Sequence, residues 1–267
     1  MPKASINGID LYYESHGDES APAIIFAHGR GGNHLSWWQQ VAEFSGEYRC
    51  ITFDHRGWGD SIAEHGTPLR ENFIADLTAL IDHLKIDKAF LVAQSMGGFA
   101  CLGFALAHPE RTLGLVLGDT TGGVATEGTL AELGKAVPPP DGPGRSLSAS
   151  FINEEPALTF LYQQINGLNP SRGEDGVISG FRLKDGPNIA QFAGWTIPTM
   201  LIVGQEDAIF PPSVIAEVQK VIPGSRMEVV PGAAHSAHFE QATIFNNLLS
   251  ELLNGVRSGS TAGAAAD

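Results

Sequence analysis

Positive charge is what this sequence has least of. It carries 16 Lys and Arg residues against 30 Asp and Glu, which gives a formal net charge of −14, and the basic residues form no cluster. Because nucleic-acid phosphates are bound by basic patches, this composition argues against a nucleic-acid partner and, for the same reason, against binding to an anionic membrane surface. We interpret the excess of acidic residues as a contribution to solubility.

Cysteines and long apolar runs are also scarce. The two cysteines, Cys50 and Cys101, lie in apolar segments, and we expect both to be small buried hydrophobic residues. A disulfide between them is left open, although two cysteines in a chain of this length are typical of a reducing compartment. No apolar run approaches the about 18 residues of a membrane-spanning helix, and the first residues lack the apolar core of a signal peptide. We therefore expect a soluble cytoplasmic protein.

Short apolar runs alternate with amphipathic segments along the rest of the chain. The runs predict strands over residues 4–6, 9–14, 23–27, 49–53, 90–93, 113–117, 200–203 and 227–230. Apolar residues at helical spacing predict helices over residues 73–84, 96–107, 214–221 and 244–252, the last of which should end near Asn254-Gly255. Asn7-Gly8 indicates a two-residue hairpin turn, and Thr67-Pro68 is typical of a helix start. The alternation predicts an α/β fold with a mostly parallel central sheet flanked by helices.

The alternation stops over residues 120–195. This interval contains Val-Pro-Pro-Pro, Asp-Gly-Pro-Gly and a helical piece near residues 154–166. Because an unstructured stretch of this length is unusual in a compact domain, we expect an inserted helical lid there. Residues 1–119 and 196–256 would form the core, and residues 257–267, rich in Gly, Ser and Ala, would form a disordered tail.

Ser95 carries the most informative motif. It lies in Ala-Gln-Ser-Met-Gly-Gly, between a predicted strand and a predicted helix. This is the arrangement of a nucleophile elbow of the G-x-S-x-G type, with Ala93 in the first glycine position and Gly97 in the second. A sharp turn between strand and helix exposes the hydroxyl and places helix N–H groups beneath the atom that it attacks.

Four further segments follow predicted strands: His28-Gly-Arg-Gly-Gly32, Asp54-His-Arg-Gly-Trp-Gly-Asp-Ser61, Gly204-Gln-Glu-Asp207 and Gly232-Ala-Ala-His235. With the elbow, they resemble the α/β-hydrolase superfamily in its serine-nucleophile branch, which includes carboxylesterases, enol-lactonases and C–C bond hydrolases. The resemblance covers nearly all of residues 4–256, and the serine, acid and histidine segments come in the chain order that this fold uses. It implies the α/β-hydrolase fold with an inserted lid.

The resemblance also implies a role for each residue of the site. Ser95 would be the nucleophile, His235 the base that takes its proton, and Asp207 the acid that orients the imidazole. The backbone N–H groups of Met96 and Arg30 would bind the oxyanion of the tetrahedral intermediate.

Two of these assignments have competitors in the sequence. His238 lies three residues after His235, and Asp119, which follows a core strand, competes with Asp207 as the acid. Glu206 is interpreted as a solvated neighbour. Because no set of Cys, His and carboxylate partners accompanies the two histidines, we predict no metal site.

Further residues near the proposed oxyanion loop are assigned to the substrate pocket: His28, Gly29, Trp37 and Trp38. His28 is also a candidate for a structural role that holds the loop in place, and the choice between core and pocket wall is left open for the two tryptophans. The side chain of Arg30 is expected to face solvent.

We predict a serine hydrolase that cleaves a carboxylic ester or lactone of a small, mainly apolar substrate through an acyl-enzyme on Ser95, with no cofactor. The same fold used by a C–C bond hydrolase, or by a cofactor-free oxygenase or lyase that relies on the histidine–acid pair, is the first alternative. A non-catalytic ligand-binding protein is the second. The expected partner is a small-molecule substrate, and a homodimer is left open.

Overall fold

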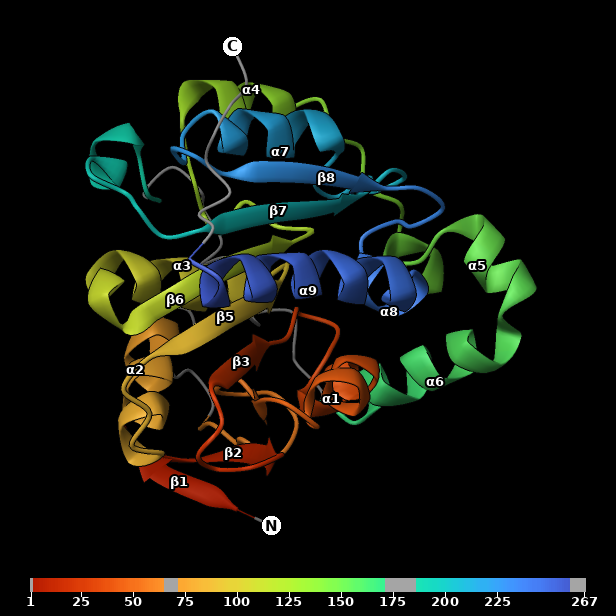
Figure 1. Ribbon diagram of the computed structural model, residues 1–267. Coiled ribbons are helices and arrows are strands. Elements are labelled where there is room, and N and C mark those ends of the chain that lie inside the picture. Colours follow the sequence, from red (N-terminus) through yellow and green to blue (C-terminus); the bar gives the residue numbers. More distant parts are fainter. Residues whose placement is uncertain (1, 65–71, 171–185, 260–267) are drawn as a thin grey trace.

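The computed structural model describes residues 2–64, 72–170 and 186–259 of the 267-residue chain (Figure 1). Within this part of the chain, the strands form one eight-stranded sheet in the order β1-β2-β4-β3-β5-β6-β7-β8. Their bounds are β1 (Lys3–Ile6), β2 (Ile9–His16), β3 (Ala23–Ala27), β4 (Arg49–Phe53), β5 (Ala89–Gln94), β6 (Thr112–Gly118), β7 (Thr199–Gly204) and β8 (Arg226–Val230). The α-helices are α1 (Trp38–Phe44), α2 (Phe73–His83), α3 (Gly97–Ala107), α4 (Glu127–Leu133), α5 (Ala149–Glu154), α6 (Pro156–Gly167), α7 (Pro212–Gln219), α8 (Ala237–Glu240) and α9 (Ala242–Arg257).

Antiparallel pairing is confined to the edge of the sheet that holds the hairpin. β1 and β2 are joined by Asn7 and Gly8, whose φ angles of 45° and 77° are those of a tight hairpin turn. β2 pairs with β4 in antiparallel register, whereas all pairs from β4 to β8 are parallel. The predicted mostly parallel sheet with a hairpin at its edge is confirmed.

Helices cover both faces of the sheet. Residues of α2, α3 and α7, such as Leu77, Phe104 and Ile215, pack on one face in a single buried cluster. Residues of α1 and α9, such as Phe44 and Phe245, pack on the other. Because both faces are covered, the central strands are buried on both sides, which accounts for their continuous apolar runs.

The chain between β6 and β7 forms α4, α5 and α6, followed by a short 3₁₀ helix (Ile189–Phe192). In Figure 1, α5 and α6 lie on the side toward which the arrowheads of β7 and β8 point. The helix predicted near residues 154–166 corresponds to α6. The side chain of Asn33, in the loop after β3, donates a hydrogen bond to the carbonyl of Ile165 in α6 at 2.8 Å. α6 is thereby attached to the loops at the carboxyl ends of the strands.

The last helix extends two residues beyond its predicted end near Asn254-Gly255. α9 continues to Arg257, because Val256 packs against the core cluster and Arg257 forms an ion pair with Glu47 at 3.2 Å. Residue 257 is therefore helical, not part of a disordered tail. The rest of the predicted tail beyond Gly259, and the helix start predicted at Thr67-Pro68, lie outside the described residues.

Both cysteines are buried and unpaired, Cys101 in the cluster on one face of the sheet and Cys50 in the cluster on the other. Among the described helices, none combines the length and the apolar character needed to cross a bilayer.

Candidate active site

Ser95 lies in the turn between β5 and α3 with a φ of 48°, a left-handed conformation that is strained for any residue except glycine. Hydrogen bonds from the neighbouring strand and its loop hold this turn. The Ser95 N–H donates to the carbonyl of Gly118 at 3.0 Å, and the hydroxyl of Thr120 donates to the carbonyl of Ser95 at 2.6 Å. The backbone is thus held in the strained form while the side chain stays partly exposed.

The small residues of the elbow are required by close packing. A Cβ on Gly97 would run into the carbonyl of Ala27 in β3, and a Cβ on Gly98 would run into the side chain of Thr120. Ala93, which occupies the first glycine position, is fully buried and lies opposite Ala27 in the parallel register. An alanine is therefore accommodated there.

Three loops bring Ser95, His235 and Asp207 into one chain of hydrogen bonds. Ser95 Oγ lies 2.8 Å from His235 Nε2, and His235 Nδ1 lies 2.8 Å from Asp207 Oδ2. Since an ionised carboxylate only accepts, the proton of the neutral imidazole belongs on Nδ1, and Nε2 then accepts from the serine hydroxyl. These loops follow β5, β8 and β7, so strands distant in sequence meet at one edge of the sheet.

The environment of His235 acts on its pKa in two directions. Burial disfavours the imidazolium and is the strongest influence, but the charge and hydrogen bond of Asp207, together with the charge of Asp119, outweigh it, so the pKa of His235 is raised. The imidazole is therefore a stronger base than a free histidine while remaining only 5% exposed.

The competing residues make other contacts. Asp119 accepts hydrogen bonds from the backbone N–H of Gly204 at 2.8 Å and of Ala237 at 2.9 Å, so it ties two loops together. Burial, aided by the charge of Asp207, raises the pKa of Asp119 to about 8. His238 is buried beside the indole of Trp37, with ring centroids 4.5 Å apart, and burial lowers its pKa to about 3. The geometry thus joins Asp207 and His235, rather than Asp119 and His238, to the serine.

The loop after β3 lies against the elbow. A Cβ on Gly29 would strike the amide of Gln94 and come within 3.1 Å of Ser95 Cβ. Within the described part of the chain, the backbone N–H groups of Arg30 and Met96 have no acceptor. Met96 has the φ and ψ of a helical residue at the start of α3, and the Arg30 side chain is exposed.

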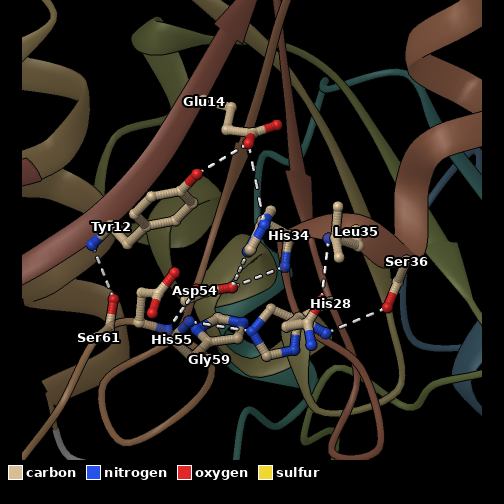
Figure 2. Close-up of polar contacts among 12 residues, drawn as sticks. Tyr12, Glu14, His28, His34, Leu35, Ser36, Asp54, His55, Gly59 and Ser61 are labelled. Atoms are coloured by element: carbon tan, nitrogen blue, oxygen red, sulfur yellow. Dashed lines mark hydrogen bonds and ion pairs between the residues drawn. The ribbon is translucent and has the colours of Figure 1, made fainter. Parts of the chain in front are cut away.

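Of the residues assigned to the pocket, His28 has a structural position. It is fully buried, and its Nε2 accepts the backbone N–H of His55 at 3.0 Å (Figure 2). Its Nδ1 lies 2.7 Å from the carbonyl of Gly29. Both ring nitrogens are engaged with backbone groups, so His28 connects the loops after β3 and β4.

The two tryptophans do not form a pocket wall together. Trp37 is fully buried in the core, where it packs against Phe26, Phe245 and His238. Trp38, the next residue, is 41% exposed. Because side chains of adjacent residues at the start of α1 point in different directions, Trp37 enters the core and Trp38 faces the surface.

Figure 2 also shows a polar network that secures the loop after β3. The carboxylate of Asp54 accepts hydrogen bonds from the backbone N–H of His34 at 2.7 Å and from the N–H of Asp60 at 2.8 Å, and it pairs with His34 Nδ1 at 2.9 Å. Burial lowers the pKa of His34, but the hydrogen bond and charge of Asp54 and the charge of Glu14 outweigh it, so this pKa is raised. Asp54 thereby joins the loop after β3 to the turn after β4.

Sequence reasoning missed two polar contacts of the histidine loop. The side chain of Gln94 donates to the carbonyl of His235 at 2.7 Å, and the hydroxyl of Tyr162 in α6 lies 3.0 Å from the hydroxyl of Ser236. The only signal for Gln94 was its place directly before the serine. Tyr162 gave no signal, because its contact joins segments far apart in the chain.

No group of three or more His, Cys, Asp or Glu side chains suited to a metal ion occurs within residues 2–64, 72–170 and 186–259.

Comparison with known proteins bears on the family. The model of the alpha/beta hydrolase fold family matches residues 22–140 and 125–242. The chain is 26% identical over 260 residues to 3-oxoadipate enol-lactonase 1 of Acinetobacter baylyi, covering 94% of this chain and 95% of that protein. It is 27% identical to a 2-hydroxy-6-oxononadienedioate/2-hydroxy-6-oxononatrienedioate hydrolase of Cupriavidus pinatubonensis, covering 87% of each chain.

A solved structure of a thermophilic esterase from Thermogutta terrifontis superimposes with a TM-score of 0.76 at 26% identity, covering 96% of this chain and 97% of that one. Because the family match extends over most of the chain, and the fold and the order of its motifs agree with it, the protein belongs to the α/β-hydrolase fold family.

Proposed function

We propose that this protein is a serine hydrolase that cleaves a carboxylic ester or lactone of a small, mainly apolar substrate through an acyl-enzyme on Ser95. The observation that carries the proposal is the hydrogen-bond chain from Ser95 Oγ through His235 to Asp207, with 2.8 Å at each step. The similarity to an enol-lactonase and an esterase supports a hydrolase.

Acylation begins when Ser95 Oγ attacks the carbonyl carbon and His235 Nε2 takes the hydroxyl proton. A serine hydroxyl hardly ionises at neutral pH, so it needs a base within hydrogen-bond reach. Asp207 keeps the Nδ1–H tautomer and stabilises the imidazolium that forms. His235 then gives the proton to the leaving oxygen, which departs as an alcohol from an ester or stays tethered to the acyl group when a lactone ring opens.

The oxyanion of each tetrahedral intermediate would be bound by the backbone N–H groups of Met96 and Arg30. Both lack an acceptor within the described residues, and Met96 begins α3, where the positive end of the helix favours an anion. In the second half-reaction, water loses a proton to His235 Nε2 and attacks the acyl carbon. His235 then returns that proton to Ser95 Oγ as the acyl–Oγ bond breaks and the carboxylic acid product leaves.

The segment over residues 120–195 would act as the lid, with its helices α4 to α6 limiting access to the site. Supporting contacts join α6 and the residues just after it to loops around Ser95: the Asn33–Ile165 hydrogen bond, the Tyr162–Ser236 contact and a hydrogen bond from the Gly59 N–H to Asn169 Oδ1 at 3.1 Å. Such a cover would exclude water and favour an apolar substrate.

The test is reaction with a fluorophosphonate, followed by intact mass measurement, on the wild type and on Ser95→Ala. A single adduct on the wild type that is absent from the variant supports the proposal, and a panel of esters and lactones then defines the leaving group. An unlabelled wild type, or an equal adduct on Ser95→Ala, contradicts an activated Ser95.

Turnover measurements separate the alternatives. Turnover that survives Ser95→Ala and is lost in His235→Ala would indicate oxygenase or lyase chemistry by the histidine–acid pair. Ligand binding without turnover, unchanged in Ser95→Ala, would indicate a binding protein.

A further inference from the structure

Glu240 is a buried carboxylate that has no part in the reaction proposed above. It ends α8, five residues after His235, and is 7% exposed. Its Oε1 accepts the backbone N–H of Ala234 at 2.8 Å, and its Oε2 accepts the backbone N–H of Ser148 at 2.6 Å. One side chain therefore contacts two segments that lie far apart in the chain.

Each of these two segments has a distinct place in the site. Ala234 directly precedes His235, so its N–H belongs to the loop that presents the imidazole. Ser148 is the N-cap of α5, where its hydroxyl accepts the N–H of Phe151 at 3.2 Å, so its own N–H belongs to the start of the first of the two helices α5 and α6 of the proposed lid.

A carboxylate is suited to this contact because it offers two acceptor oxygens and no donor. An amide of the same shape offers one oxygen, and its NH₂ group would face a backbone N–H donor. Burial raises the pKa of Glu240, against the opposing effect of the hydrogen bonds from Ser148 and Ala234. Placing an ionisable group here costs desolvation, and these contacts offset that cost.

We propose that Glu240 is a positioning residue that holds the His235 loop and the start of α5 in one arrangement, so that the seating of the covering helices and the placement of the base are coupled. The inference rests on the proposed function in taking His235 as the base. The contact between Tyr162 and Ser236 is a second link between the same two parts and acts in the same sense.

Two variants distinguish the effect of joining the two segments from the effect of the negative charge of Glu240. Glu240→Gln keeps the shape but leaves one N–H without an acceptor, whereas Glu240→Asp keeps the charge but is one methylene too short to reach both. Glu155→Gln, at an exposed glutamate between α5 and α6, is the matched control for the loss of one negative charge. Melting temperatures establish that each variant is folded under the assay conditions.

The first readout is hydrogen–deuterium exchange of peptides covering residues 146–150 and 232–236, which does not depend on catalysis. Loss of a buried hydrogen bond should accelerate exchange about 10-fold in the Glu240→Gln peptide whose N–H loses its acceptor, and the control should match the wild type. Unchanged exchange in both peptides of both Glu240 variants overturns the bridge.

The second readout is the rate of fluorophosphonate labelling per folded site. Since a displacement of about 1 Å in a catalytic group can cost about 100-fold, we expect both Glu240 variants to label about 10- to 100-fold more slowly. A wild-type rate in folded Glu240→Gln overturns the positioning role, and a wild-type rate in Glu240→Asp alone shows that charge acts without the bridge and also overturns it. If the wild type does not label, the proposed function fails, and the exchange experiment by itself decides whether Glu240 joins the two segments.

Discussion

Replacing Asp207 by asparagine should invert the tautomer of His235. Asp207 Oδ1 accepts the backbone N–H groups of Ile209 at 2.8 Å and Phe210 at 3.0 Å, and Oδ2 faces His235 Nδ1. In asparagine, the amide oxygen must stay with the two backbone donors, since an NH₂ group there would face two N–H groups. The NH₂ group is then directed at Nδ1.

The expected loss of kcat in Asp207→Asn follows from that orientation of the amide. When Nδ1 accepts from the amide, the imidazole proton moves to Nε2, which faces Ser95 Oγ at 2.8 Å and no longer accepts the serine proton. In serine proteases with the same three residues, this substitution lowers kcat about 10⁴-fold. We expect a loss of the same order here, equivalent to about 5.5 kcal/mol of transition-state stabilisation.

The assay is kcat on the best ester or lactone substrate, with the fluorophosphonate labelling rate as a second measure. Glu206→Gln removes the adjacent exposed carboxylate and should leave kcat within about two-fold of the wild type. If Asp207→Asn keeps more than about a tenth of wild-type kcat, its hydrogen bond to the base does not control the tautomer. Loss of kcat in Asp119→Asn together with retention in Asp207→Asn would assign the acid to Asp119 instead.

Three further substitutions test other parts of the structure. After burial, the charge of Arg145 is the other influence that lowers the pKa of His235, so Arg145→Gln should raise that pKa and move the acid limb of the kcat/KM–pH profile to higher pH; a shift to lower pH would contradict this. Asp76→Asn breaks a buried pair with Arg56, whose contacts measure 2.7 and 2.8 Å, and urea unfolding should show a loss of about 3–5 kcal/mol, whereas a loss below about 1 kcal/mol would mean that the pair is dispensable. Gly204→Ala places a Cβ against backbone carbonyls of the histidine loop and should lower the stability measured by thermal unfolding by about 1–3 kcal/mol; an unchanged melting temperature would show that the loop moves freely.

The parallel strands were predictable because they are buried on both faces and therefore read as continuous apolar runs. β3 and β4 have the predicted bounds, Ala23–Ala27 and Arg49–Phe53. β5 ends at Gln94, one residue later than predicted. A pattern of apolar residues does not include a glutamine in a buried strand. The structure buries this polar residue because its amide is satisfied by the carbonyl of His235, a contact that no local pattern encodes.

The helices between β6 and β7 were the least predictable part. α5 and α6 are attached to the rest of the molecule through a small apolar cluster around Phe239 and through polar contacts, such as those of Ser148 with Glu240 and of Asn33 with Ile165. These contacts join residues 92 and 132 positions apart, so helical periodicity carries little information about them. The residues of the site were predictable for the opposite reason, since each follows a recognisable strand and the parallel sheet brings those ends together.

Two aspartates lie close to one imidazole, and their surroundings assign them different tasks. Asp207 accepts two backbone N–H groups and faces His235 Nδ1, whereas each oxygen of Asp119 accepts one backbone N–H and none faces the ring. Two charged carboxylates beside one buried histidine would repel each other, and burial together with the charge of Asp207 raises the pKa of Asp119 to about 8. The contacts of Asp119 with the backbone of Gly204 and Ala237 hold the acid and histidine loops together. The sequence alone left these two residues as competitors because both follow strands of the same sheet. Only the direction of their side chains and the donors around them distinguish the aspartate that is hydrogen-bonded to His235 from the one that braces the neighbouring loops.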